Sequence, residues 1–179
     1  MAHAFDELSE LLSASKLRPQ IIPGRIARPF FHDAIYNFSV ISCATQELGT
    51  PQKQDEQVWQ INSSILKFSH FLAVRPTLLK DFRIWHEHRT QRAVLDLENW
   101  PLLPRGFLTD DTQAASVTFL VTTGALQRAG KNIVLKATKQ NPLIQLLRAV
   151  EKNNLFQSER DVIRKLQELR ITQSMLGVG

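Results

Sequence analysis

The stretch Leu120–Thr138, LVTTGALQRAGKNIVLKAT, constrains the fold most strongly, because its hydrophobic period changes halfway along. The first half predicts the end of a helix that begins after an N-cap at Thr109 and stops at Gly130. The second half predicts a short strand, since Ile133 and Leu135 fall on one face of an alternating pattern. The basic turn AGKN joins the two, so the chain places a strand directly after a helix.

Elsewhere the chain shows mainly helical patterns separated by proline and glycine. Apolar residues spaced three and four apart predict further helices at about residues 29–48, 54–74, 77–92, 142–152 and 158–174. The pattern is cleanest in the second of these, where the intervals are three, four, three and four. Asn141 and Pro142 suit a helix start, and Ser158 with Asp161 resembles a weak capping box.

This order of helix, helix, connector, helix, strand and helix resembles a winged helix-turn-helix with helical extensions at both ends. We therefore expect a mainly α fold with a winged helix-turn-helix-like core and a short β-wing, formed as one domain by residues 29–179. The sequence shows no clear second strand for the wing. Residues 1–28 are expected to form a separate N-terminal helix and a proline-rich linker.

The N-terminal segment is one candidate for binding a partner. Its expected helix, at about residues 4–16, is acidic on one face and apolar on the other. The residues of the apolar face are Phe5, Leu8, Leu11 and Leu12. A helix this short is marginal alone, so we expect it to pack either on the body of the protein or on a partner. Trp59, beside the apolar face of the helix predicted over 54–74, is a second candidate anchor.

The charge of the chain permits a polyanionic partner without requiring one. The net charge is +5 and the pI is about 9.7. Four cations lie around the predicted wing, namely Arg128, Lys131, Lys136 and Lys139. Cations of this kind contact DNA phosphates, so these four are the predicted nucleic-acid-binding residues. A solvated charged face without any ligand is the alternative interpretation.

The helix before the wing offers few side chains that could read bases. Its polar residues are Gln113, Thr118, Thr122 and Gln127. Base recognition usually needs arginine, asparagine or glutamine on an exposed helix, so non-specific DNA contact is favoured over operator recognition. A second basic group, diluted by two carboxylates, falls on the helix predicted over 77–92. Its members are Arg75, Lys80, Arg83, Arg89 and Arg92.

No motif in the sequence predicts catalysis, a metal site or a cofactor. The phosphate-binding loop, the dinucleotide fingerprint and the HExxH zinc motif are all missing from the sequence. Cys43 is the one cysteine, and its apolar surroundings predict a buried, inert thiol. His86 and His88 diverge on a helix and are expected to be surface residues. No apolar run is long enough for a membrane span, and the acidic N-terminus is unlike a signal peptide, which together favour the cytoplasm.

The segment ASVTFLVTTGALQRAGKNIVLKAT resembles the helix, turn and wing of the middle components of bacterial ABC-type three-component systems, including the accessory winged-helix subunits of Lamassu-like antiphage complexes. The resemblance covers residues 54–172 and rests on the order of the elements and a few apolar positions. It implies a non-enzymatic subunit that partners an ATPase of the structural maintenance of chromosomes (SMC) type, with an effector subunit as a further partner.

Three hypotheses for the function follow. The first is an adaptor that couples such an ATPase to double-stranded DNA or to an effector, in antiphage or anti-plasmid defence. The second is a stand-alone winged-helix transcriptional regulator, a homodimer through its terminal helices. The third is a viral helical nucleocapsid-type protein, which the helices and the basic charge also favour. The alternating charges of the last helix, ERDVIRKLQELR, favour helix-on-helix packing within the chain or across a subunit boundary.

Overall fold

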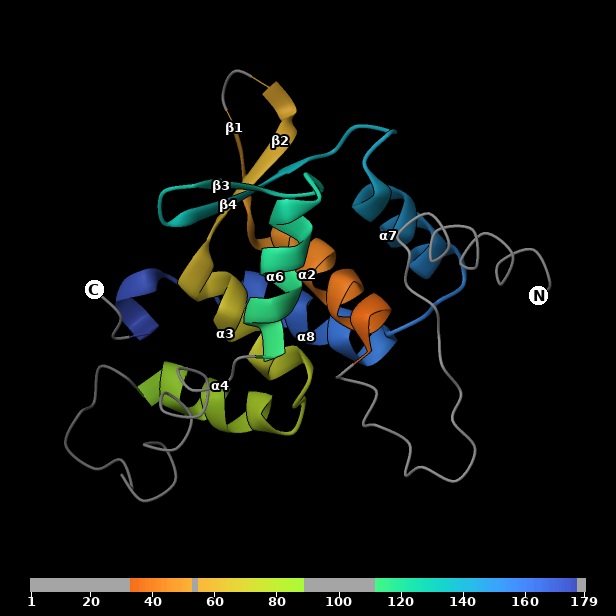
Figure 1. Cartoon of the computed structure of the whole chain (residues 1–179). Coiled ribbons are helices and arrows are strands. Elements are labelled where there is room, and N and C mark those ends of the chain that lie inside the picture. The colour runs from red at the N-terminus through yellow and green to blue at the C-terminus, as the bar shows by residue number, and fades with distance from the viewer. Residues whose placement is uncertain (1–32, 53–54, 89–111, 177–179) are drawn as a thin grey trace.

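The computed structural model describes residues 33–52, 55–88 and 112–176, and this part of the chain is mainly helical with a small antiparallel sheet (Figure 1). The helices are α2 (Ala34–Leu48), α3 (Ser63–Ala73), α4 (Leu78–His88), α6 (Thr112–Thr122), α7 (Pro142–Lys152) and α8 (Gln157–Glu168), followed by the short 3-10 helix η2 (Gln173–Leu176). The strands are β1 (Thr50–Gln52), β2 (Asp55–Asn62), β3 (Gln127–Ala129) and β4 (Asn132–Lys136). The expectation of a mainly α fold is confirmed.

The sheet consists of two hairpins joined side by side, in the order β1-β2-β4-β3. Each hairpin is local in sequence, whereas the central pair joins β2 to β4, with Ile61 opposite Ile133. The expected strand after the basic turn is confirmed as β4. A second strand, β3, pairs with β4, and the sequence pattern did not predict it. A two-residue turn with Gly130 at a φ of +59° closes this hairpin, a conformation that glycine adopts at little cost.

The prediction of one helix over residues 54–74 is wrong for the first half of that range. Residues 55–62 form β2, one of the two central strands of the sheet, and the helix begins only at Ser63. The side chain of Asn62 accepts a hydrogen bond from the Ser64 amide at 2.9 Å and caps the helix start. The apolar spacing of three and four persisted across this boundary by coincidence, so the periodicity concealed the change from strand to helix.

The helix predicted to run as far as Gly130 ends much earlier. α6 stops at Thr122, and Gly124 with a φ of +76° reverses the chain. The Leu126 amide then donates to the Leu120 carbonyl at 3.0 Å, which closes the turn. Gly124 thus lies at the helix end, and the prediction that the helix stops at Gly130 is wrong.

The start and end of the last helix also differ from the prediction. The predicted capping box does not form, since the Ser158 hydroxyl donates to the neighbouring carboxylate of Glu159 at 2.8 Å. Phe156 precedes the helix in a left-handed conformation and provides no side-chain cap. The helix ends at Glu168 rather than near residue 174, because Arg170 turns the chain with a φ of +49°.

Helix α2 lies at the centre of the core. It contacts α3, α6, α7, α8 and both central strands. Three buried hydroxyl groups on α2 donate to carbonyls four residues earlier, so they need no partner outside the helix; they belong to Ser39, Ser42 and Thr45. The hydroxyl of Tyr36 donates to the buried carboxylate of Glu159 at 3.1 Å, which ties α2 to α8. Burial, together with the charge of Glu159, raises the pKa of the Tyr36 hydroxyl.

Cys43 lies on α2 inside this core and is 4 % exposed, which confirms the expected buried thiol. Burial, reinforced by the charge of Glu47, raises the pKa of the thiol to about 12. The ionised thiol is therefore excluded from the folded state far more strongly than from the unfolded chain.

We expect Cys43 to make the protein sensitive to alkali. Because its pKa is raised by folding, its contribution is fully present below its ordinary pKa of 9.0 and is lost as the pH rises towards 12. At about pH 10.5 the loss should reach roughly 2 kcal/mol of unfolding free energy. The measurement is urea unfolding at several alkaline pH values for the wild type and Cys43→Ala. Parallel pH dependences for the two proteins would contradict the expectation.

Candidate nucleic-acid interface

The four predicted DNA-contacting cations are all exposed on or beside the β3–β4 hairpin. Arg128 lies on β3, all of whose residues are exposed, and Lys131 lies in the turn. Lys136 ends β4, and Lys139 follows in the loop before α7. The buried residues Ile133, Val134 and Leu135 hold β4 in the body of the protein, so the hairpin is a supported element with charged edges.

The four cations do not form one cluster. Arg128 is paired across the strands with Ile133, whereas Lys136 extends from the opposite face of β4. Lys131 and Lys136 lie at the two ends of β4, about 16 Å apart at the rise of an extended strand. Along the hairpin, Arg128 and Lys131 therefore lie towards the turn, and Lys136 and Lys139 lie towards the other end of β4. An elongated polyanion such as a nucleic-acid backbone could span this length, while a small anion could not.

Asn141 fixes the hairpin to the helix that follows it. Its side-chain oxygen accepts from the Leu143 amide at 3.0 Å and caps α7, where Pro142 takes the first helical position as predicted. Its side-chain nitrogen donates to the carbonyls of Ala125 at 2.9 Å and Lys136 at 3.0 Å. One amide thus joins the start of the hairpin, its end and α7.

Replacing Asn141 with alanine should destabilise the protein by about 2 kcal/mol. The loss combines a helix cap, worth about 1 kcal/mol, with two hydrogen bonds of a half-buried side chain. Asn141→Ser keeps a capping oxygen but cannot reach both carbonyls, so it should cost about half as much. Chemical denaturation of both variants measures the difference. Equal stabilities of the two variants would mean that the cap contributes nothing, whereas a serine variant as stable as the wild type would mean that only the cap matters.

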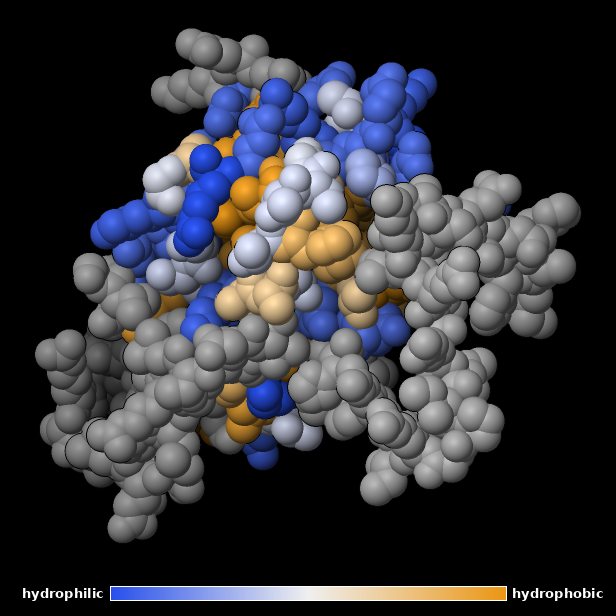
Figure 2. All heavy atoms as spheres, in the orientation of Figure 1, coloured by the Kyte–Doolittle hydropathy of each residue, from blue (hydrophilic) through white to orange (hydrophobic). Residues whose placement is uncertain are grey.

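Helix α6, which precedes the hairpin, presents an uncharged surface. Its exposed residues are Ala114, Ala115, Thr118 and Thr122. Figure 2 shows this region as pale to light orange across the middle of the face, below the hydrophilic residues gathered over the strands. Of the side chains predicted to read bases, Gln113 is buried and Gln127 lies on β3. The Thr122 hydroxyl donates to the carbonyl of Thr118, so this helix has little with which to recognise a base sequence.

The structure describes only one of the predicted partner-binding residues, Trp59. Phe5, Leu8, Leu11 and Leu12 lie outside the described residues, as do Arg89 and Arg92 of the second basic group. Trp59 lies on β2, on the same side as the buried Ile61, and packs half-buried against the core. Trp59 was predicted as a partner-binding anchor because it would lie beside the apolar face of a helix. That reason does not hold, because the segment is a strand.

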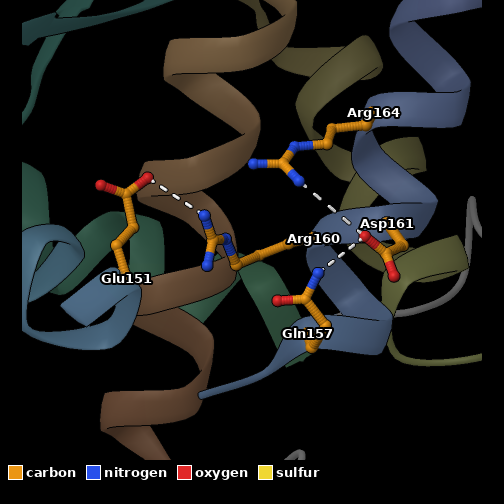
Figure 3. Close-up of polar contacts among 5 residues, drawn as sticks. All are labelled: Glu151, Gln157, Arg160, Asp161 and Arg164. Atoms are coloured by element: carbon orange, nitrogen blue, oxygen red, sulfur yellow. Dashed lines mark hydrogen bonds and ion pairs between the residues drawn. The ribbon is translucent and has the colours of Figure 1, made fainter. Parts of the chain in front are cut away.

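Helix α8, whose charges alternate in sign, packs against other helices of the same chain. Its apolar residues Val162, Ile163 and Leu166 are buried, and the helix contacts α2 and α3. Figure 3 shows Arg160 facing Glu151 at the end of α7, with a nitrogen–oxygen distance of 3.2 Å. The carboxylate of Asp161 accepts a hydrogen bond from the side-chain amide of Gln157. The same carboxylate oxygen lies 4.0 Å from a guanidinium nitrogen of Arg164. The sequence did not reveal the link between Arg160 and Glu151, because it depends on how α7 and α8 meet.

Within residues 33–52, 55–88 and 112–176, no group of three or more histidine, cysteine or carboxylate side chains is placed to hold a metal ion. In the same part of the chain, no helix has both the length and the apolar character needed to cross a bilayer.

No protein-family model matches this chain, and neither a curated protein nor a solved structure shows a significant match to it.

Proposed function

We propose that the protein is a non-enzymatic accessory subunit that contacts double-stranded DNA without sequence preference through its β3–β4 hairpin. The observation that carries this proposal is the supported hairpin, whose exposed cations flank a buried strand core. Phosphate contacts need cations that water can reach and a rigid element that positions them. The uncharged surface of α6 supports backbone contact over base recognition.

The order of the elements supports a winged helix as the framework for this contact. With β1 and α4 set aside as additions, a helix, a strand, two helices and a hairpin occur in the order α2, β2, α3, α6, β3 and β4, with β4 between β2 and β3. In this arrangement α6 takes the place of the recognition helix and the β3–β4 hairpin that of the wing. Helix α4 is an addition between the two helices of the core.

The proposed partner is an SMC-type or ABC-type ATPase, with an effector as a further subunit, in antiphage or anti-plasmid defence. This part of the proposal comes from the sequence resemblance of residues 54–172. It is tested by expressing the tagged protein with its genomic neighbours and identifying co-purified proteins by mass spectrometry and light scattering. Stable recovery with a large ATPase supports the adaptor, whereas recovery as a lone dimer contradicts it.

Charge reversal in the hairpin should weaken DNA binding strongly. Each phosphate contact contributes about 0.9 to the slope of log affinity against log salt, so Lys131→Glu with Lys136→Glu should lower that slope by about 2. Affinity at moderate salt should fall roughly 10- to 100-fold. Fluorescence anisotropy with random and fixed duplexes measures both quantities.

The matched control is Arg148→Glu with Lys152→Glu, which reverses two exposed cations on α7. It changes the net charge equally but lies outside the hairpin, so its effect should be much smaller. Equal losses for the two double variants would show that binding follows net charge alone. Strong preference for one duplex sequence would instead support the stand-alone regulator.

A further inference from the structure

Lys139 lies in a turn between β4 and α7, at the opposite end of β4 from the hairpin turn (Figure 1). The backbone amide of Asn141 donates to the carbonyl of Thr138 at 3.0 Å, so residues 138–141 form a hydrogen-bonded turn. Its two central residues, Lys139 and Gln140, are exposed. The turn therefore presents a cation to solvent at its tip.

Both ends of this segment are attached to the body of the protein. Before the turn, the amide of Ala137 donates to the carbonyl of Gln57 at 2.6 Å, which continues the pairing of β2 with β4 by one residue. After the turn, the side chain of Asn141 caps α7 and donates to the carbonyl of Lys136. The segment that carries Lys139 is consequently short and fixed on both sides.

Gln145 adds a contact at the tip of the turn. Its side-chain nitrogen, on α7, donates to the carbonyl of Lys139 at 3.0 Å. The backbone of Lys139 itself is thus held, in addition to the two ends of the turn. Because Gln145 is exposed, this hydrogen bond should contribute little to the stability of the fold. Its structural effect is to fix the backbone of a residue that carries charge.

The charge of Lys139 is not neutralised within the described part of the chain. There, neither Lys136 nor Lys139 forms an ion pair, in contrast to Arg160, which is paired with Glu151. The cation is therefore available to an anion from outside. A backbone that is already ordered also avoids the loss of conformational entropy that a flexible loop undergoes when it binds.

We propose that Gln145 is a positioning residue for DNA binding, which holds the backbone of Lys139 so that this cation meets a phosphate. The inference rests on the proposed contact between the hairpin and DNA, and it adds a preformed turn to that contact. In this role Gln145 acts through Lys139 and needs no contact with DNA of its own. Its loss should therefore weaken binding by no more than the loss of Lys139.

The test is Gln145→Met, which removes the hydrogen-bond donor with little change in side-chain length and none in charge. Fluorescence anisotropy with a random duplex should show binding that is weaker by about three- to tenfold. Lys139→Gln should weaken binding at least as much and lower the slope of log affinity against log salt by about 0.9. The melting temperature of Gln145→Met should stay within about 2 °C of the wild type, which shows that the variant is folded.

Gln157→Met is the matched control. It also removes an exposed glutamine whose side chain donates a hydrogen bond, in this case to Asp161 on α8. The control should leave the affinity for the duplex within about twofold of the wild type. Equal losses for the two glutamine variants would overturn the inference.

A double-mutant cycle tests whether Gln145 acts through Lys139. The effect of Gln145→Met should fall below about twofold when Lys139→Gln is already present, and should persist when Lys131→Gln is present instead. An effect of the same size in both backgrounds would overturn the inference, because a general loss of structure would not depend on Lys139.

The failure of this inference can be distinguished from the failure of the proposed function. A wild-type protein without salt-dependent DNA binding would overturn both. Binding that falls with the charge reversals at Lys131 and Lys136, but that Gln145→Met leaves unchanged, would overturn the positioning role alone.

Discussion

Phe82→Ala should destabilise the protein by about 3–5 kcal/mol, the largest effect that we expect from a single change. Phe82 joins α4 to the core together with Leu79, and at 0 % exposure it is the more deeply buried of the two. Its ring meets Phe68 of α3 edge to face, with 5.0 Å between the ring centroids. Truncation would remove both the buried ring and this aromatic contact, leaving a cavity that α3 and α4 can fill only in part.

Urea unfolding of the wild type and the variant measures this loss. Ile84→Ala is the matched control, because Ile84 lies two residues further along α4 and is 42 % exposed. The control should change the unfolding free energy by less than about 0.5 kcal/mol. If Phe82→Ala cost less than about 1 kcal/mol, the packing of α4 against α3 would be contradicted.

Gly49→Ala should cost about 3 kcal/mol, although the backbone conformation of Gly49 is open to any residue. Its φ is −74°, so the reason is steric. A β-carbon at this position would overlap the backbone carbonyl of Thr45 and would lie 3.2 Å from the carbonyl oxygen of Gln60. The first belongs to the end of α2 and the second to β2, so neither can move without disturbing the junction of helix and sheet.

Gly130→Ala separates this steric effect from the effect of a positive φ. A β-carbon on Gly130 would meet nothing within 4 Å, but its φ of +59° strains any residue with a side chain. We expect a cost of about 1 kcal/mol, well below that of Gly49→Ala. Thermal and urea unfolding of both variants give the order. A larger loss for Gly130→Ala would contradict the close approach of α2 and β2 at Gly49.

Local signals in the sequence were most reliable where a cap and a periodic pattern agreed. Asn141 and Pro142 correctly predicted the start of α7, and alternation correctly predicted β4. The prediction over residues 54–74 failed because Val58 and Ile61 of a strand continued the spacing of the helix that follows. The signal that could have corrected it was Asn62 followed by two serines, which is typical of a helix N-terminus.

The candidate sites depended more heavily on tertiary structure. All four cations of the predicted wing are exposed, as contacts to DNA phosphates require. The position of Arg128 could not be predicted without the second strand of the hairpin, whose register places it opposite Ile133. The hydrogen bond from Gln145 to the carbonyl of Lys139 was beyond prediction for a similar reason, since it depends on the conformation of the turn that precedes α7.

The sheet also has a consequence for how the chain folds. β1 with β2 and β3 with β4 each form a pair between close neighbours in sequence, and such hairpins form in about 1–10 μs. Joining β2 to β4 brings Asn62 to Asn132 and closes a loop of about 70 residues, a step with a much larger entropic barrier. Assembly should therefore proceed from two rapidly formed halves to one sheet. The element proposed to contact DNA belongs to the half that can form early, while its rigid support is completed only when the distant halves meet.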